Sequence, residues 1–314
     1  MKSTSDRLAP RGRRRGRAAV AALPAALLAT PSAALLATLW AALSAALPAA
    51  LSALLSATLP AMLCGALWAA SAAGQERRIP LEQLKSGITF APSAVQTLQA
   101  DDFANPGMLW VEQGEKLWRE AAGTAAVSCA TCHDDAARSM RGVAARYPRY
   151  ASGMNGLVDL AGQINACRST RQGAAPLALE SEPLLALTAY IGYQSRGLPI
   201  HVSIDGPARP FFEAGRALYD RRMGQMNLAC THCHEQNWGR RLLAETISQG
   251  QPNAYPIYRL DWQTMGSLQR RLRSCLFGVR AEMWPYGAQE MLDLELYLAW
   301  RAEGLPIETP GVRK

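Results

Sequence analysis

Two copies of one five-residue motif, at residues 129–133 and 230–234, constrain this chain more than any other feature. Each copy reads C-x-x-C-H, and the two lie 101 positions apart. In this motif the thiols form thioether bonds with a haem, and the histidine binds the haem iron. A single C-x-x-C also occurs in zinc sites and redox-active dithiols, but two copies with matching flanks favour haem. We therefore expect two covalently bound haem c groups, attached at Cys129, Cys132, Cys230 and Cys233 and ligated by His133 and His234.

The similarity between the two parts of the chain extends beyond the motifs. Residues Gly114–Trp118 and Gly215–Tyr219 precede their motifs at the same offset of 101. Further along, Gly197–Ile200 and Gly304–Ile307 both read Gly-Leu-Pro-Ile, at an offset of 107. A unit of roughly 100 residues therefore occurs twice, which indicates tandem domains.

The repeated unit has the apolar spacing of helices. Apolar residues recur every three or four positions, and no run alternates with the period of two that strands show. The expected helices are 114–122, 157–167, 182–194, 266–276 and 288–301. We predict an all-α fold with two tandem class I-like cytochrome c domains related by this internal repeat, at residues 79–200 and 201–314. Four aromatic residues are expected to pack helix against helix: Tyr190, Tyr193, Tyr297 and Trp300.

Residues 1–73 have the order of a secretory leader: a basic start, a long Ala- and Leu-rich run, and small residues at the end. We expect cleavage near Ala72 or Ala73 and a periplasmic location. An uncleaved membrane anchor is the alternative, although four prolines interrupt the apolar run. Cys64 lies in this leader and is assigned no function.

Net charge gives no support for nucleic-acid binding. The leader holds seven of the 33 Lys and Arg residues and one of the 25 Asp and Glu residues. The remainder therefore has 26 basic and 24 acidic residues, so the formal charge of +8 comes mostly from the leader. We expect no nucleic-acid partner.

The second axial ligand of each iron is the residue that decides the function. Cys167 and Cys275 lie 108 positions apart, in equivalent predicted helices, and each follows one of the motifs. No methionine is equivalent in the two halves, although Met or His is the usual second ligand of an electron carrier. We predict that Cys167 and Cys275 ligate the two irons. The alternatives are a disulfide between them, or ligation by Met154, Met265, Met283 or His201.

The two predicted ligands differ in their neighbours. Arg271 precedes Cys275 by four residues and shares its helix face, whereas Gln163 takes that position beside Cys167. A guanidinium stabilises a nearby thiolate and binds small dianions through paired hydrogen bonds. We therefore predict that Arg271 and Cys275 are catalytic, and that Arg270 and Arg273 belong to a solvated basic face.

These features together resemble the SoxA family, the dihaem c-type cytochrome subunits of the SoxAX thiosulfate-oxidising complex. The resemblance lies in both haem motifs, in the paired cysteines, and in the runs Gly266–Cys275, Val279–Glu282 and Leu294–Arg301. It spans nearly the whole chain after the leader.

The resemblance implies an enzyme, an L-cysteine S-thiosulfotransferase that joins thiosulfate oxidatively to a cysteine of a SoxYZ-like carrier. It implies a heterodimer with a SoxX-like monohaem cytochrome, and a small cytochrome c as electron acceptor. By residue matching, Cys275 would be the active-site ligand, carried as a persulfide, Arg271 would line the substrate channel, and Cys167 would be the distal ligand of the first haem. The alternatives are a dihaem electron carrier of the cytochrome c4 kind and a thiosulfate dehydrogenase forming tetrathionate.

Overall fold

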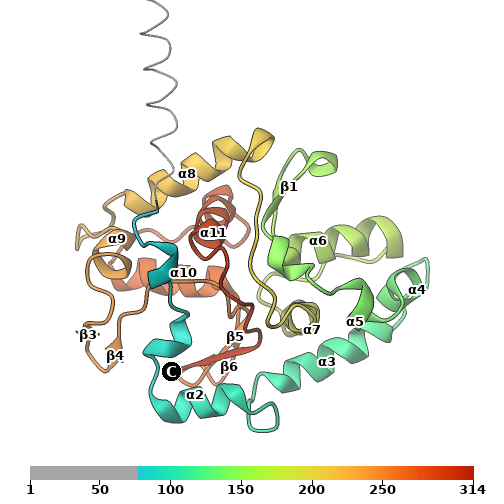
Figure 1. Ribbon diagram of the computed structural model, residues 1–314. Coiled ribbons are helices and arrows are strands. Elements are labelled where there is room, and N and C mark those ends of the chain that lie inside the picture. Colours follow the sequence, from blue (N-terminus) through green and yellow to red (C-terminus); the bar gives the residue numbers. More distant parts are fainter. Residues whose placement is uncertain (1–76) are drawn as a thin grey trace, which may run out of the picture. The chain divides into compact units, whose positions relative to one another are not determined.

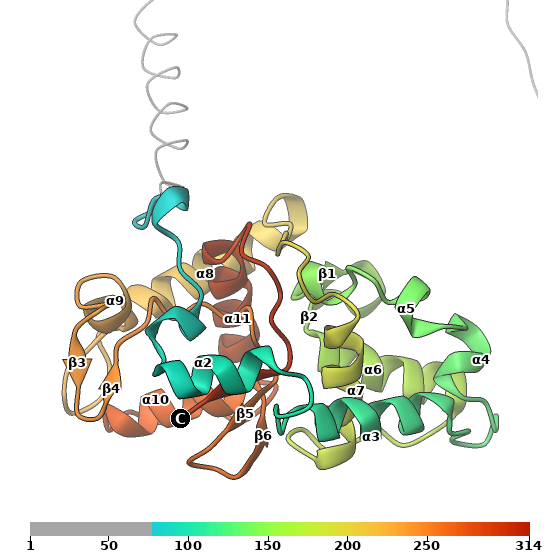
Figure 2. The same ribbon diagram turned by 60° about the horizontal axis from the view of Figure 1, so that its bottom comes forward.

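The computed structural model describes residues 77–314 (Figures 1 and 2). The predicted leader, its cleavage near Ala72 or Ala73, and Cys64 lie outside the described residues. Within residues 77–314, no helix has both the length and the apolar character needed to cross a membrane.

The same succession of helices occurs twice in the described residues. An N-terminal helix leads into the short helix of the haem motif, and two further helices follow. In the first half these are α3 Met108–Arg119, α4 Cys129–His133, α6 Leu160–Cys167 and α7 Glu182–Tyr193. In the second half they are α8 Arg209–Asp220, α9 Cys230–His234, α10 Leu268–Gly278 and α11 Gln289–Arg301. The helical repeat predicted from the sequence is therefore present in the structure.

Short elements fill the connections. Two further helices are α2 Ser93–Ala100 and α5 Ala136–Ser139. The single turns are η2 Leu81–Gln83, η3 Gly87–Phe90, η4 Ala144–Arg146, η5 Ser152–Met154, the π-turn η6 Arg168–Gln172 and η7 Gly206–Ala208. The strands are β1 Arg149–Ala151, β2 Gly156–Val158, β3 Arg241–Leu242, β4 Glu245–Thr246, β5 Ile257–Arg259, β6 Thr264–Gly266 and β7 Gly311–Arg313.

The strands form hairpins, which are also repeated. Antiparallel β1–β2 has its counterpart in β5–β6, and β7 extends the second hairpin by pairing parallel to β5. The predicted helix 157–167 is therefore partly wrong, because its first residues belong to β2 and α6 begins only after its N-cap Asp159. Likewise Gly266 belongs to β6, and Ser267 caps α10. Strands of two or three residues are too short for alternation to be visible in a sequence.

Each half is held together by one close helix crossing, α3 on α7 and α8 on α11. Gly114 and Gly215 occupy equivalent positions at these crossings. A Cβ atom on Gly114 would lie 2.1 Å from the carbonyl oxygen of Ala186, and one on Gly215 would lie 2.0 Å from that of Asp293. Only glycine allows the backbones to approach this closely.

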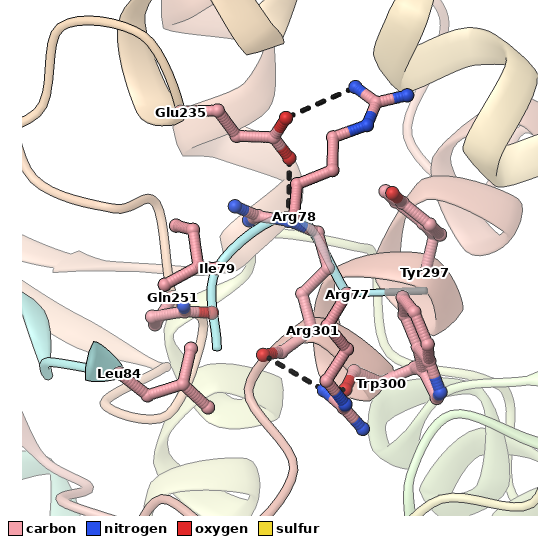
Figure 3. A pocket seen from close by; sticks show the side chains of 9 residues that line it. All are labelled: Arg77, Arg78, Ile79, Leu84, Glu235, Gln251, Tyr297, Trp300 and Arg301. Atoms are coloured by element: carbon pink, nitrogen blue, oxygen red, sulfur yellow. Dashed lines mark hydrogen bonds and ion pairs between the residues drawn. The ribbon is translucent and has the colours of Figure 1, made fainter. Parts of the chain in front are cut away.

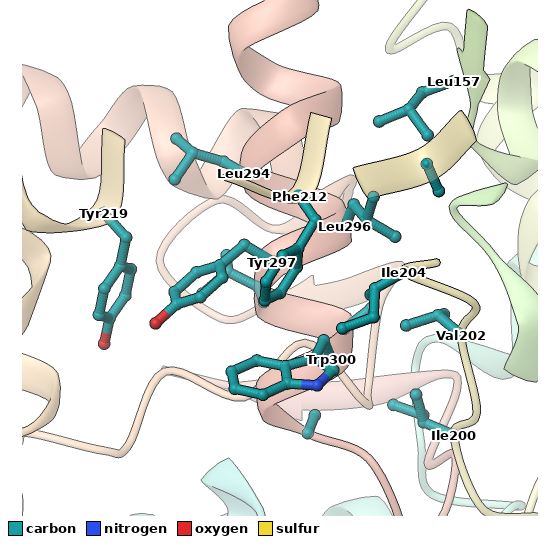
Figure 4. Close-up of a cluster of buried hydrophobic side chains, with 14 of the residues drawn as sticks. Leu157, Ile200, Val202, Ile204, Phe212, Tyr219, Leu294, Leu296, Tyr297 and Trp300 are labelled. Atoms are coloured by element: carbon teal, nitrogen blue, oxygen red, sulfur yellow. The ribbon is translucent and has the colours of Figure 1, made fainter. Parts of the chain in front are cut away.

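Aromatic side chains fill the core beside both crossings, and Figure 4 shows those beside the α8–α11 crossing. In the second half Phe212 packs on Trp300 and Tyr297, with ring centroids 5.0 and 5.6 Å apart. In the first half Tyr190 packs on Trp118 at 5.9 Å. The predicted helix-to-helix packing is therefore confirmed for these tyrosines and for Trp300. Tyr193 also packs against the apolar cluster of the first half, and its hydroxyl group donates a hydrogen bond to Asp102 at 3.0 Å.

The segment before α3 binds the second half of the chain. Arg78 forms a paired hydrogen bond with Asp220 and a 3.1 Å ion pair with Glu235, which directly follows the second haem motif (Figure 3). Asn105 is fully buried, and its amide donates to the carbonyl oxygen of Pro310 at 2.9 Å. These contacts attach residues 77–105 to the half that is distant in sequence.

The two halves meet around a cavity of about 140 Å³. Equivalent residues of both halves line it, among them Tyr147 with Tyr255, Pro148 with Pro256, and Leu160 with Leu268. At this interface, equivalent residues of the two halves therefore line the same cavity.

Candidate haem and thiolate site

The two haem motifs form one-turn helices with equivalent caps. In α4, the Thr131 hydroxyl accepts a hydrogen bond from the backbone N–H of Ser128 at 3.2 Å. In α9, the imidazole of His232, which is equivalent to Thr131, accepts from the N–H of Ala229 at 3.0 Å. His232 therefore caps its helix, which explains a histidine within the motif that is not needed as an iron ligand.

The second motif histidine is held in one orientation. The Nδ1 atom of His234 donates to the carbonyl oxygen of Ser248 at 2.8 Å, which leaves Nε2 as the free ring nitrogen. Gly250 lies against the ring, and a Cβ there would be 2.9 Å from His234 Cγ. In the first half, the His133 ring packs on Trp118, with centroids 5.7 Å apart.

Cys167 and Cys275 lie at separate sites, each beside the motif of its own half. Burial is the main cause that raises the pKa of the Cys129 thiol, and charge on Cys167 adds to this effect. Burial followed by charge on Cys275 likewise raises the pKa of Cys230, to about 12. All six cysteines of residues 77–314 carry free thiols, so the alternative disulfide between Cys167 and Cys275 is not present.

Helix α10 brings Arg271 and Cys275 together, as their spacing of four predicts. Burial alone would raise the pKa of the Cys275 thiol, but the Arg271 charge and a hydrogen bond with His234 lower it to about 7. In return, charge on Cys275 raises the pKa of Arg271 despite its burial. Among residues 77–314, no carboxylate lies within ion-pair distance of the Arg271 guanidinium, so the thiolate is its principal counter-charge.

The equivalent position in the first half is neutral. The amide of Gln163 donates to Cys167 Sγ at 3.6 Å, and its oxygen accepts from Arg149 at 2.9 Å. The two cysteines therefore have the same place in the repeat and different electrostatic surroundings.

Arg270 and Arg273 do not form the solvated basic face that was predicted. The Arg270 guanidinium stacks on the ring of Trp262, 4.3 Å from its centroid, and Arg273 stacks on Tyr286 at 4.7 Å. Both side chains are half-buried. A sequence with periodic charges does not reveal such stacking, because the aromatic partners come from other segments.

The other candidate ligands lie elsewhere. Met154 and Met283 are 44% and 41% exposed, Met154 in the turn η5 and Met283 in the segment between α10 and α11. Met265 is fully buried, but it packs in the apolar cluster of α3 and α7 in the first half. His201 is exposed and pairs with Glu303 at 2.8 Å. Cys167 and Cys275 each lie beside the motif of their own half, and their ligation of the irons stays a prediction.

The residues present fit covalent haem c. Each half offers two free thiols spaced for thioether bonds, a histidine, and a further thiol brought to the motif by a separate helix. In the second half, the Cys275 thiol lies within hydrogen-bonding reach of the His234 imidazole, so these two side chains are the ones that would hold the haem iron.

One residue near Cys275 was missed by the sequence reasoning. Arg259, on β5, is buried, and its charge also lowers the pKa of the Cys275 thiol, after burial, Arg271 and His234. The repeat could have drawn attention to it, because the residue 108 positions earlier is Ala151.

The fold and the site define a c-type cytochrome with two tandem domains. The profile of the SoxA/TsdA cytochrome c domain matches the chain twice, at residues 113–200 and 214–307. The chain therefore belongs to this family, and the predicted fold and family resemblance are confirmed.

Known relatives agree with this assignment. The L-cysteine S-thiosulfotransferase subunit SoxA of Pseudaminobacter salicylatoxidans is 42% identical over 236 residues, which are 75% of this chain and 82% of that protein. The SoxA subunit of Rhodovulum sulfidophilum is 38% identical over 74% of this chain and 81% of its own. The crystal structure of SoxXA from Paracoccus pantotrophus contains a similar chain, with a TM-score of 0.71, 37% identity, and coverage of 74% of this chain and 87% of that one.

Proposed function

We propose that this chain is the SoxA subunit of an L-cysteine S-thiosulfotransferase, with its active site at Cys275 and Arg271. The observation that carries the proposal is the pairing of the half-buried Cys275 thiol with the Arg271 guanidinium, which has no carboxylate within ion-pair distance among residues 77–314. Relatives that bear this activity in their names match most of the chain.

The reaction joins thiosulfate to a cysteine of a carrier protein. The dianion S₂O₃²⁻ and a carrier thiol form a sulfur–sulfur bond, giving a cysteine S-thiosulfonate, one proton and two electrons. Haem c, when bound, accepts these electrons one at a time and passes them on. Arg271 binds the dianion through paired hydrogen bonds and holds it beside the Cys275 sulfur.

The remaining parts of the proposal follow from the repeat and the family. Two haem c groups are attached, one per motif, and a SoxX-like monohaem cytochrome is the partner subunit. The carrier is SoxYZ-like, a small cytochrome c is the final acceptor, and the location is the periplasm. The neutral Gln163 beside Cys167 supports a first haem that relays electrons or has a structural role, without binding substrate.

The test is Arg271→Ala, with Gln163→Ala as the matched control at the equivalent position of the first half. Loss of a charge-assisted anion contact should lower the kcat/KM for thiosulfate by about a hundredfold. Gln163→Ala should leave kcat/KM nearly unchanged. Intact mass spectrometry and the haem spectrum check that both variants still carry two haems.

Two outcomes would contradict the proposal. Full activity of Arg271→Ala would remove this residue from the active site. Release of tetrathionate without any mass increase on the carrier cysteine would assign a thiosulfate dehydrogenase instead.

A further inference from the structure

Arg259 is a buried cation whose hydrogen-bonding capacity is only partly used. It lies on β5 and is 6% exposed. Among residues 77–314, its Nε atom has no hydrogen-bond partner. Its terminal nitrogen is 3.3 Å from Glu245 and 3.9 Å from Asp261. Leaving a charged donor unpaired in a buried position is unfavourable, and this indicates that a further acceptor belongs there.

The guanidinium groups of Arg259 and Arg271 lie close enough for their positive charges to interact. Burial and then the positive charge of Arg271 lower the pKa of Arg259. The charges of both guanidinium groups also act on the Cys275 thiol and on the half-buried Tyr255. Glu245 and Asp261 offset part of this positive charge through one terminal nitrogen of Arg259, and its Nε atom stays available to a small anion.

Arg259 and its carboxylate partner Glu245 occur in the second half of the repeat and have no counterparts in the first. Ala151 and Gln163 are the equivalents of Arg259 and Arg271 at the common offset of 108, so the first half lacks both guanidiniums there. The second half is also seven residues longer between its motif and β5, where it forms the hairpin β3–β4. That hairpin carries Glu245, the ion-pair partner of Arg259.

The Arg259 group lies close to solvent on one side. Glu245 and Asp261 are 43% and 53% exposed, whereas Arg259 itself is 8% exposed at the side chain. Glu245 and Asp261 are therefore the solvent-accessible partners of the Arg259 guanidinium. Glu245 competes with a small anion for the same nitrogen.

We propose that Arg259 is a second substrate-binding residue, which together with Arg271 binds the dianionic thiosulfate beside Cys275, and that Glu245 is the counter-ion it exchanges for substrate. This inference rests on the proposed function for the identity of the anion. Two guanidiniums match the double charge of thiosulfate and offer hydrogen bonds to several of its oxygens at once. Trp262 holds Arg259 in place from the other side, since its ring centroid is 5.1 Å from the guanidinium carbon.

The experiment measures thiosulfate binding to the holoprotein complex by calorimetry, in the absence of carrier. Arg259→Gln should weaken binding about tenfold, because it removes a charge-assisted contact. Glu245→Gln should tighten binding several-fold, because it removes the competing carboxylate. Arg270→Gln is the matched control, since it removes an arginine that stacks on the same Trp262, and its affinity should stay within twofold of the parent.

The two variants are expected to change the thiosulfate affinity in opposite directions, and this distinguishes a role in binding from a loss of structure. A merely structural Arg259 would not give tighter binding on Glu245→Gln, and Glu245 lies on a half-exposed hairpin where substitution preserves the fold. An affinity of Glu245→Gln equal to or weaker than that of the parent overturns the inference, as does an Arg259→Gln affinity within twofold of it.

The same samples distinguish failure of this inference from failure of the proposed function. Coupling of thiosulfate to the carrier is read separately, as the mass gained by the carrier cysteine. If the parent complex couples thiosulfate to the carrier and the variants bind thiosulfate as the parent does, only the role of Arg259 is refuted and the proposed function stands. Absence of coupling by the parent complex, with the predicted pattern of affinities, refutes the thiosulfotransferase and leaves an anion site.

Discussion

Cys167 and Cys275 occupy equivalent positions of the repeated unit, but the residue four positions earlier is neutral in the first half and an arginine in the second. The two thiols therefore differ in their electrostatic surroundings. That difference was predictable from sequence, because residues four apart on a helix share a face whatever the rest of the fold does. The contribution of Arg259 was not predictable in the same way. It depends on a three-residue strand and on a charge that reaches Cys275 from another segment.

Glu295 is a second residue whose state only the tertiary structure reveals. It lines the cavity between the halves, and burial, followed by charge on Asp159, raises its pKa well above the usual value. A carboxyl group with a raised folded-state pKa contributes stability below its unfolded pKa, and this contribution is lost as pH rises. Glu295→Gln should therefore flatten the fall in stability between pH 5 and about pH 8.

Denaturant midpoints at the two pH values test this expectation. The variant should gain most over the parent at the higher pH, where Glu295 is driven to ionise inside the protein. Glu290→Gln, on the same helix, serves as the control and should follow the parent. A variant that loses as much stability with rising pH as the parent would show that Glu295 is not the group responsible.

At the scale of elements, the helices were the predictable part and the hairpins were not. Helix α7 at Glu182–Tyr193 and helix α11 at Gln289–Arg301 match the predicted ranges within a residue, because long apolar faces carry a strong periodic signal. The residues Leu157 and Val158 continue the apolar pattern of α6, yet they belong to β2. Pairing with β1 outweighed local periodicity there.

The glycine crossings predict where each half is most sensitive. Gly215→Ala should destabilise the second half by about 1–3 kcal/mol, because its Cβ would overlap the carbonyl of Asp293 and force α8 away from α11. Gly278→Ala, at the end of α10, has open space around the added methyl and should be nearly neutral. Thermal unfolding of both variants measures the difference, and equal midpoints would refute a tight α8–α11 crossing.

At the scale of the whole molecule, the repeat in the sequence suggests two separate domains, and the contacts show how the second half is completed. The segment before α3 binds there: Gln99 accepts from the backbone N–H of Val312 at 2.9 Å, and the backbone N–H of Lys85 donates to Gln249 at 2.8 Å. A repeat does not predict this, because the bridging residues lie outside the repeated unit.

Asn105 tests this attachment. Asn105→Ala leaves the buried Pro310 carbonyl and the N–H of Gly107 without their partners, and should cost about 1–3 kcal/mol. Gln96→Ala removes an exposed side-chain hydrogen bond to Ala91 and should cost under about 0.5 kcal/mol. Denaturant unfolding measures both, and a cost for Asn105→Ala no greater than that of Gln96→Ala would show that the contact contributes little.

The clasp formed by residues 77–105 and Pro310–Arg313 sets an order of assembly. Translation produces residues 77–105 about 200 residues before Pro310–Arg313. Residues 77–105 therefore cannot form their native contacts until the later segment has been made. The half that holds Cys275 is closed only when Pro310–Arg313 have been made. Loss of these four residues would therefore also remove the contacts that hold Gln99 and Asn105.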